Sequence, residues 1–129
     1  MINEAQIQTL FARANRPIRS EVYELKITKT GRLPFARLAS HQERSLSKID
    51  SSVGAYHKLS DMSADRKPYD SHFLINIPAY VAVCFYRPRK PKILYLIRIK
   101  DFIAFRDRNT MKSMTEEDAK VISERTLEL

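Results

Sequence analysis

Polar and apolar residues alternate from Glu21 to Thr28, with the two-residue period of a strand that has two different faces. One predicted face carries Tyr23, Leu25 and Ile27. The other predicted face carries Val22, Glu24, Lys26 and Thr28. The following residues, 29–31, end in glycine and predict a turn.

Three segments have the pattern of helices. Near the start of the chain, Asn3 and Gln6 have the spacing of a capping box, and apolar residues then recur at helical spacing up to about residue 15. Ser40 and Glu43 form a second such pair, and the helix predicted after them has one face made of Leu38, Gln42, Leu46 and Ile49. Thr115 is expected to cap a final helix, because residues 116–118 are acidic and suit the positive end of a helix dipole.

The rest of the chain predicts mainly strands. Residues 55–77 have the pattern of a hairpin with a polar turn. Residues 80–86 and 93–99 are strongly apolar and predict two further strands, joined by a basic loop at 87–92 that two prolines stiffen. Residues 101–105 predict a short helical turn. We expect residues 1–129 to form one domain with one core.

Charge and cysteine content indicate the kind of partner and the cellular compartment to expect. Lys and Arg number 23 and Asp and Glu 15, giving a net charge of +8 that favours an anionic partner, most often nucleic acid. The single cysteine, Cys84, excludes an intrachain disulfide and suggests a reducing compartment. No signal segment is expected, and the apolar run at 77–86 is about half the ~20 residues that span a bilayer. We therefore expect a soluble cytoplasmic protein without a membrane partner, for which a viral or phage source is compatible.

The predicted strand at 21–28 also presents candidate chemistry. Glu24 and Lys26 leave the same face about 7 Å apart. A carboxylate can hold a hard divalent cation, and a neighbouring ammonium can position a water and offset charge that builds at phosphorus. Metal-assisted phosphodiester hydrolysis needs this combination. The alternative interpretation is an ordinary ion pair on an exposed strand.

Three further polar residues could join them. Glu4 lies on the inward face of the first predicted helix, although a carboxylate at a helix start is also favoured by the dipole alone. Gln42 lies on the inward face of the second helix, where a core-edge amide bonded to the backbone is the alternative. His41 is either a phosphate contact or a solvent-facing histidine.

The order of these motifs resembles a known family. Glu24-Leu25-Lys26 on a strand, then a basic turn, Leu33-Pro34-Phe35 and a helix bearing His41-Gln42 is similar to the PD-(D/E)XK nucleases, closest to RecU-type Holliday-junction resolvases. Residues 79–106 also resemble the back half of that nuclease core, with Lys100-Asp101-Phe102 after its second strand. The resemblance covers roughly residues 20–50 and 79–106.

The resemblance implies a fold and an activity. The fold is restriction-endonuclease-like α/β, with a central mixed sheet of about five strands flanked by helices. The activity is that of a Mg²⁺-dependent DNA endonuclease, with Mn²⁺ as the alternative metal, which cuts branched DNA during recombination and repair. Its products are a 5′-phosphate and a 3′-hydroxyl. A homodimer is implied, because two strands must be cut symmetrically.

The sequence departs from the family at one position. The family has an Asp, often after Pro, on a strand before the Glu-x-Lys strand, whereas no Asp precedes Glu24 here. Pro68-Tyr69-Asp70 lies at the start of the second arm of the 55–77 hairpin. Our hypothesis is that this hairpin is relocated and that Asp70 supplies the missing ligand, with Asp61 as the substitute. The alternative is that Asp70 is an ordinary turn residue.

Our hypothesis then assigns a role to each candidate residue. Asp70, Glu24 and Glu4 hold one or two Mg²⁺ ions, with the carbonyl of Leu25 as a further ligand. Lys26 orients the attacking water, and Gln42 positions a water or a phosphate. The candidates for neutralising DNA phosphates are Lys29, Arg32, Arg37, His41, Arg44, Arg66, Lys67, Arg87, Arg89, Lys90 and Lys92.

Two other functions fit the same composition. A non-catalytic basic nucleic-acid-binding protein with a nuclease-like fold would bind DNA in a salt-sensitive way without cutting it. A structural protein of a ribonucleoprotein particle is disfavoured by the absence of RNA-recognition signatures from the sequence.

Overall fold

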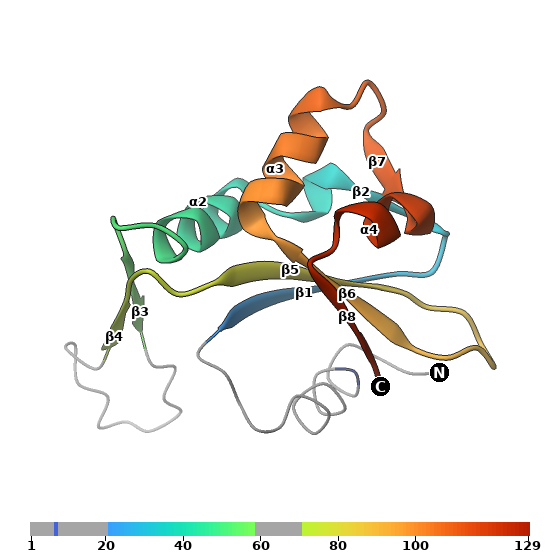
Figure 1. Ribbon diagram of the computed structural model, residues 1–129, viewed down its shortest axis with the longest axis horizontal. Coiled ribbons are helices and arrows are strands. Elements are labelled where there is room, and N and C mark those ends of the chain that lie inside the picture. Colours follow the sequence, from blue (N-terminus) through green and yellow to red (C-terminus); the bar gives the residue numbers. More distant parts are fainter. Residues whose placement is uncertain (1–6, 8–20, 59–70) are drawn as a thin grey trace.

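The computed structural model describes Ile7, residues 21–58 and residues 71–129. Its main sheet has four strands in the order β1–β5–β6–β8 (Figure 1). β1 (Val22–Thr28) pairs in parallel with β5 (Ala79–Phe85). The β5–β6 and β6–β8 pairs are antiparallel, where β6 is Ile93–Arg98 and β8 is Arg125–Glu128. The chain therefore has a mixed α/β fold with a mixed sheet, but that sheet has four strands and not about five.

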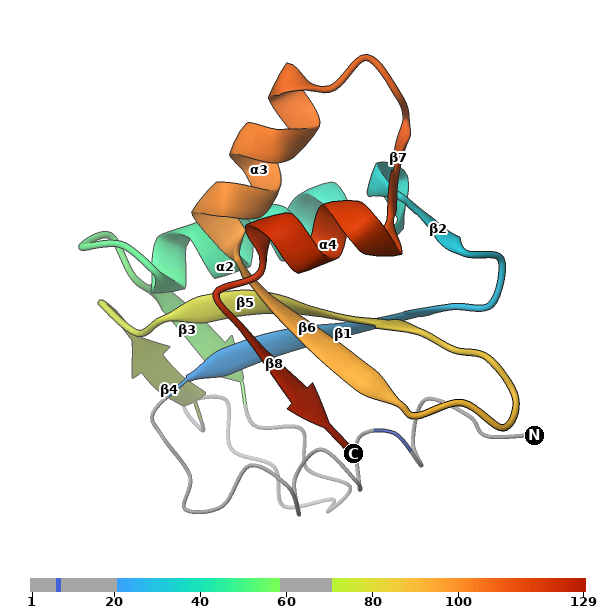
Figure 2. The same ribbon diagram turned by 45° about the vertical axis from the view of Figure 1, so that its right-hand side comes forward.

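Three helices lie on one face of this sheet (Figure 2). They are α2 (Ser40–Ile49), α3 (Ile99–Arg108) and α4 (Glu116–Ile122). Val81 and Val83 of β5 are fully buried beneath them. On the other face, Ile7 is fully buried against a second cluster that includes Leu25 and Cys84. β5 is buried along its whole length, as its continuous apolar run requires.

The two faces of β1 are those that the alternation predicted. Glu24 is in register with Val81 and Lys26 with Val83, and both valines belong to the core beneath the helices. Glu24 and Lys26 therefore project toward the helices, whereas Leu25 packs on the opposite face. Because β1 ends the strand order of the main sheet, these two polar side chains lie at its margin.

Two short sheets complete the described fold. β2 (Arg32–Pro34) pairs with β7 (Ser113–Thr115), and β3 (Ala55–Lys58) pairs with β4 (Ser71–Leu74), both antiparallel. The β3–β4 pair confirms the hairpin predicted within 55–77. The sequence did not predict β2, β7 or β8, because three or four residues are too few to establish an alternating pattern.

The helix boundaries correct two predictions. α2 begins after Ala39, whose backbone N–H donates to Gln42 Oε1 at 3.0 Å. The Ser40–Glu43 capping box was therefore wrong: Ser40 is the first residue of the helix, and Glu43 instead accepts from Arg106. α3 is a full helix of 10 residues and not a short turn at 101–105.

The final helix begins as predicted. Thr115 Oγ1 accepts from the backbone N–H of Asp118 at 3.2 Å, and Asp118 Oδ2 accepts from the backbone N–H of Thr115 at 2.9 Å. These reciprocal bonds satisfy two groups that a helix start otherwise leaves unpaired. Among the described helices, none has the length and apolar character needed to cross a membrane.

Candidate active site at the margin of the sheet

Three of the residues singled out in the sequence meet between β1 and α2. Glu24 Oε1 accepts a hydrogen bond from Gln42 Nε2 at 2.8 Å, and Lys26 Nζ lies 3.5 Å from the same oxygen. Gln42 comes from a different element and is separated from Glu24 by 18 positions. The fold therefore joins a carboxylate, an ammonium and a carboxamide in one cluster, which we call the β1 site.

The start of α2 fixes the orientation of the carboxamide. Gln42 Oε1 accepts from the N–H of Ala39, so its amino group is the end that faces Glu24. The methyl side chain of Ala39 cannot accept the reciprocal hydrogen bond from the backbone N–H of Gln42, so only the half of the capping box made by the Gln42 side chain can form. Gln42 is thus both a structural residue of α2 and a donor to the site.

The two charged side chains of the β1 site differ in their exposure to solvent. The Lys26 side chain is 13% exposed and the Glu24 side chain 32% exposed. The hydrogen bond from Gln42 and the shortest Lys26 contact both use Oε1, and no described residue donates a hydrogen bond to Oε2. A carboxylate has about four lone-pair positions for acceptance, so Glu24 retains capacity for a cation or a water.

A guanidinium is held beside the site. Arg37 lies in the short 3₁₀ helix η1 (Phe35–Arg37), and its Nη2 donates to the carbonyl of Ile27 at 3.1 Å. Ile27 directly follows Lys26 on β1. Arg37 is exposed, so it places a positive charge beside β1 next to Lys26 and remains accessible to an anion.

The described residues supply only part of a Mg²⁺ site. Mg²⁺ prefers octahedral oxygen coordination and is usually held by one or two carboxylates together with waters and substrate phosphate. The β1 site offers the Glu24 carboxylate, and no cluster of three or more His, Cys, Asp or Glu occurs among the described residues. The other predicted ligands, Glu4, Asp61 and Asp70, lie outside the described residues. The chemistry of the site fits one ligand of such an ion.

The predicted phosphate contacts fall into several groups. Arg66 and Lys67 lie outside the described residues. Lys29 and Arg32 are exposed near the turn after β1, and Arg32 donates to Ser113 Oγ at 2.8 Å. His41 and Arg44 are exposed on α2. Arg89 and Lys90 are exposed and Lys92 is half-buried in the loop between β5 and β6.

Arg87, at the start of that loop, is already engaged. Its guanidinium lies 2.8 Å from Glu116 Oε1, and Tyr95 donates to the other oxygen of Glu116 at 2.7 Å. Partial burial favours a higher pKa of Glu116, but the hydrogen bonds from Tyr95 and Arg87 outweigh it and lower that pKa. Burial, followed by the bond to Glu116, raises the pKa of Tyr95. Arg87 and Tyr95 therefore both bind Glu116, and the charges of Arg87 and Glu116 offset each other.

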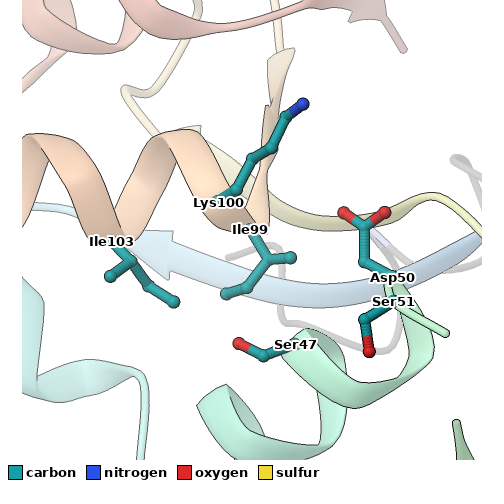
Figure 3. A pocket seen from close by; sticks show the side chains of 6 residues that line it. All are labelled: Ser47, Asp50, Ser51, Ile99, Lys100 and Ile103. Atoms are coloured by element: carbon teal, nitrogen blue, oxygen red, sulfur yellow. The ribbon is translucent and has the colours of Figure 1, made fainter. Parts of the chain in front are cut away.

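A surface pocket of about 340 Å³ lies between α2 and α3 (Figure 3). Ile99 and Ile103 project into it from α3, and Ser47 faces them from α2. Its one carboxylate, Asp50, is bound on both oxygens by Arg98, at 2.7 and 2.8 Å. The pocket therefore lacks an available carboxylate and does not compete with the β1 site as a metal centre.

Comparison of the chain with protein-family models, with curated proteins and with solved structures finds no match.

Proposed function

We propose that the protein is a metal-dependent DNA endonuclease of the PD-(D/E)XK type that acts on branched DNA, as Holliday-junction resolvases do. The observation that carries this proposal is the β1 site. There, Glu24 keeps an oxygen available while Lys26 and Gln42 converge on its other oxygen. The net charge of +8 supports a polyanionic substrate.

In the proposed reaction, each residue of the β1 site has a separate role. Lys26 orients the attacking water and offsets negative charge that develops at phosphorus. Gln42 holds the Glu24 carboxylate in place through its amino group. Glu24 would hold Mg²⁺ through its carboxylate, and the bound ion would supply Lewis-acid chemistry for the phosphodiester and its attacking water.

The remaining ligands belong to the proposal as well. Asp70 directly precedes β4 in the sequence and is the first candidate, with Asp61 as its substitute and Glu4 as a further ligand. Replacing Asp70 and Asp61 by Asn, singly, identifies the ligand by which variant loses cleavage. Symmetric incision of a junction also calls for a homodimer, which we include in the proposal.

The experiment is cleavage of a labelled four-way junction and of a linear duplex, with Mg²⁺ or with Mn²⁺. Lys26→Ala is expected to lose activity by about a hundredfold or more, because it removes one preorganised electrostatic contact to the transition state. Lys120→Ala is the matched control, since Lys120 is exposed on α4 and its one ion pair among the described residues is with Glu117 on the same helix. It should cut like the wild type.

A second function is favoured by the β5–β6 loop, where Arg89 and Lys90 are exposed and have no partner in the described part of the chain. Such a surface suits a protein that binds DNA without cutting it. The same assay distinguishes the two functions. Salt-sensitive binding without cleavage, or cleavage that Lys26→Ala leaves unchanged, rejects the endonuclease.

A further inference from the structure

Two carboxylates within residues 21–58 are directed toward arginines within residues 71–129. Glu43 on α2 and Asp50, directly after its last residue, are bound by Arg106 and Arg98, with shortest contacts of 2.6 and 2.7 Å. These arginines come from α3 and β6, more than 45 residues away in the sequence. The acidic residues of α2 therefore face the neighbouring elements, and their charge is compensated there.

The cations of α2 face the other way. His41, Arg44 and Lys48 are exposed, and within the described residues none of their side chains has a hydrogen-bond or ion-pair partner. Positions separated by three, four and seven residues lie on one side of a helix, so these side chains form a stripe about 10 Å long. The stripe lacks acidic residues, because Glu43 lies on another side of α2 and is paired with Arg106.

The stripe is linked to the β1 site by α2 itself. His41 directly precedes Gln42, whose amino group contacts Glu24. Arg37 is fixed to β1 at Ile27 and extends the positive surface beyond the start of the helix. A polyanion that lies along α2 and reaches Arg37 therefore comes close to β1 at Ile27, the residue that directly follows Lys26.

The other exposed basic surface has acidic neighbours. The loop at 87–92 is tied through Arg87 to Glu116, in a first turn of α4 that also carries Glu117 and Asp118. Glu116 and Glu117 are paired with Arg87 and Lys120, so this side of the molecule presents mixed charge to a phosphate backbone. Of the two surfaces, the α2 stripe has the more uniform positive charge.

We infer that the outward face of α2, formed by His41, Arg44 and Lys48 and extended by Arg37, is the surface on which the phosphate backbone of DNA lies. This inference rests on the proposed function for the identity of the partner, and it adds Lys48 to the contacts that the sequence suggested. It also ranks α2 above the 87–92 loop as the main binding surface.

The test compares two double variants that each remove two exposed, unpartnered positive charges. Arg44→Gln with Lys48→Gln alters the stripe, and Arg89→Gln with Lys90→Gln alters the loop. Binding to a 30-base-pair duplex and to a four-way junction is measured in EDTA over a range of salt. EDTA separates binding from cleavage, so a protein that binds without cutting is still tested.

The stripe variant is expected to weaken binding by roughly tenfold to sixtyfold at 0.1 M salt and to reduce the salt slope by about 2, since each lost phosphate contact removes about 0.9. The loop variant should lose less than about threefold, because charges beyond a Debye length of ~10 Å are screened. The charge-preserving pair Arg44→Lys with Lys48→Arg should bind like the wild type.

Three results overturn the inference: equal losses for both double variants, wild-type binding by the stripe variant, or wild-type protein that binds neither DNA. Loss of cleavage in Lys26→Ala together with unchanged binding by the stripe variant would retain the endonuclease and reject only this surface. Conversely, stripe-dependent binding without any cleavage would reject the endonuclease and keep the surface.

Discussion

Glu21 and Glu24 lie three residues apart at the start of β1, yet the fold treats them in opposite ways. Glu21 is 5% exposed, and both its oxygens accept from the Arg125 guanidinium, at 3.0 and 2.6 Å. Tyr23 also donates to it. Glu24 is 32% exposed, and its contacts in the described structure use one oxygen. The first carboxylate is saturated and the second is not.

The difference shows which charged groups are structural and which remain available. Arg125 comes from β8, at the far end of the sheet order, and also lies 5.5 Å from the centre of the Tyr80 ring. Glu21 therefore ties the first strand to the last on one face of the sheet. On the other face, no described residue donates a hydrogen bond to Oε2 of Glu24, which is what a ligand-binding carboxylate requires.

The largest expected effects come from Glu21→Gln and Glu24→Gln. The first variant should mainly lose stability and the second should mainly lose activity. Glu21→Gln leaves the half-buried guanidinium of Arg125 without its carboxylate, so we expect a loss of about 2–3 kcal/mol in the free energy of unfolding, the range of charge-assisted hydrogen bonds. Glu24→Gln breaks only a part-exposed pair and should cost less than about 1 kcal/mol. Urea unfolding followed by circular dichroism measures both values.

Activity should show the reverse order. Loss of a metal-ligand charge worth several kcal/mol predicts that Glu24→Gln cuts DNA about a thousandfold more slowly. Glu21→Gln should keep its cleavage rate at temperatures where it is folded. Similar losses of stability in the two variants would contradict the distinction between a saturated and an available carboxylate.

A smaller effect is expected from Gln42→Glu. Its carboxylate can still accept from the N–H of Ala39 but can no longer donate to Glu24, so two negative charges then face each other. We expect about 1 kcal/mol less stability without metal and a larger rise in melting temperature on adding Mg²⁺ than the wild type shows.

Gln42→Leu is the matched control, since it removes both hydrogen bonds without adding charge. It should lose stability without gaining any response to Mg²⁺. If Gln42→Glu and the wild type respond equally to the metal, the β1 site does not hold a divalent ion.

The smallest effect concerns the face of the sheet that carries Leu25 and Cys84. Cys84 is fully buried there, and burial raises the pKa of its thiol to about 11. The folded protein should therefore not react with a thiol reagent at pH 8, and it should react fully in urea. Rapid reaction of the folded protein would show that solvent and reagent reach this face of the sheet.

The same group gives a small pH dependence of stability. Its pKa is higher in the folded state than the ordinary value of 9.0, so its contribution is complete below pH 9 and is lost as the pH rises toward 11. At pH 10 the difference is about 1 kcal/mol. Cys84→Ala should remove this part of the alkaline loss, measured by urea unfolding at pH 8 and pH 10.

The sequence by itself determined the local features of this protein. The two-residue period of β1 assigned Glu24 and Lys26 to one face, and the helical period placed Gln42 on the inner face of α2, because both patterns depend only on backbone geometry. The continuous apolar runs identified β5 and β6, and the side chain of Thr115 marked the start of α4.

Tertiary structure alone decided how those features meet. The contact of Gln42 with Glu24, the pairing of Glu21 with Arg125 and the inward binding of Glu43 by Arg106 join residues 18, 104 and 63 positions apart. No local period encodes such pairings, since they depend on which strand edge and helix face the core brings together. For the same reason, the sequence singled out Glu24 as a candidate ligand but did not indicate that Glu21, three residues earlier, would be bound by Arg125.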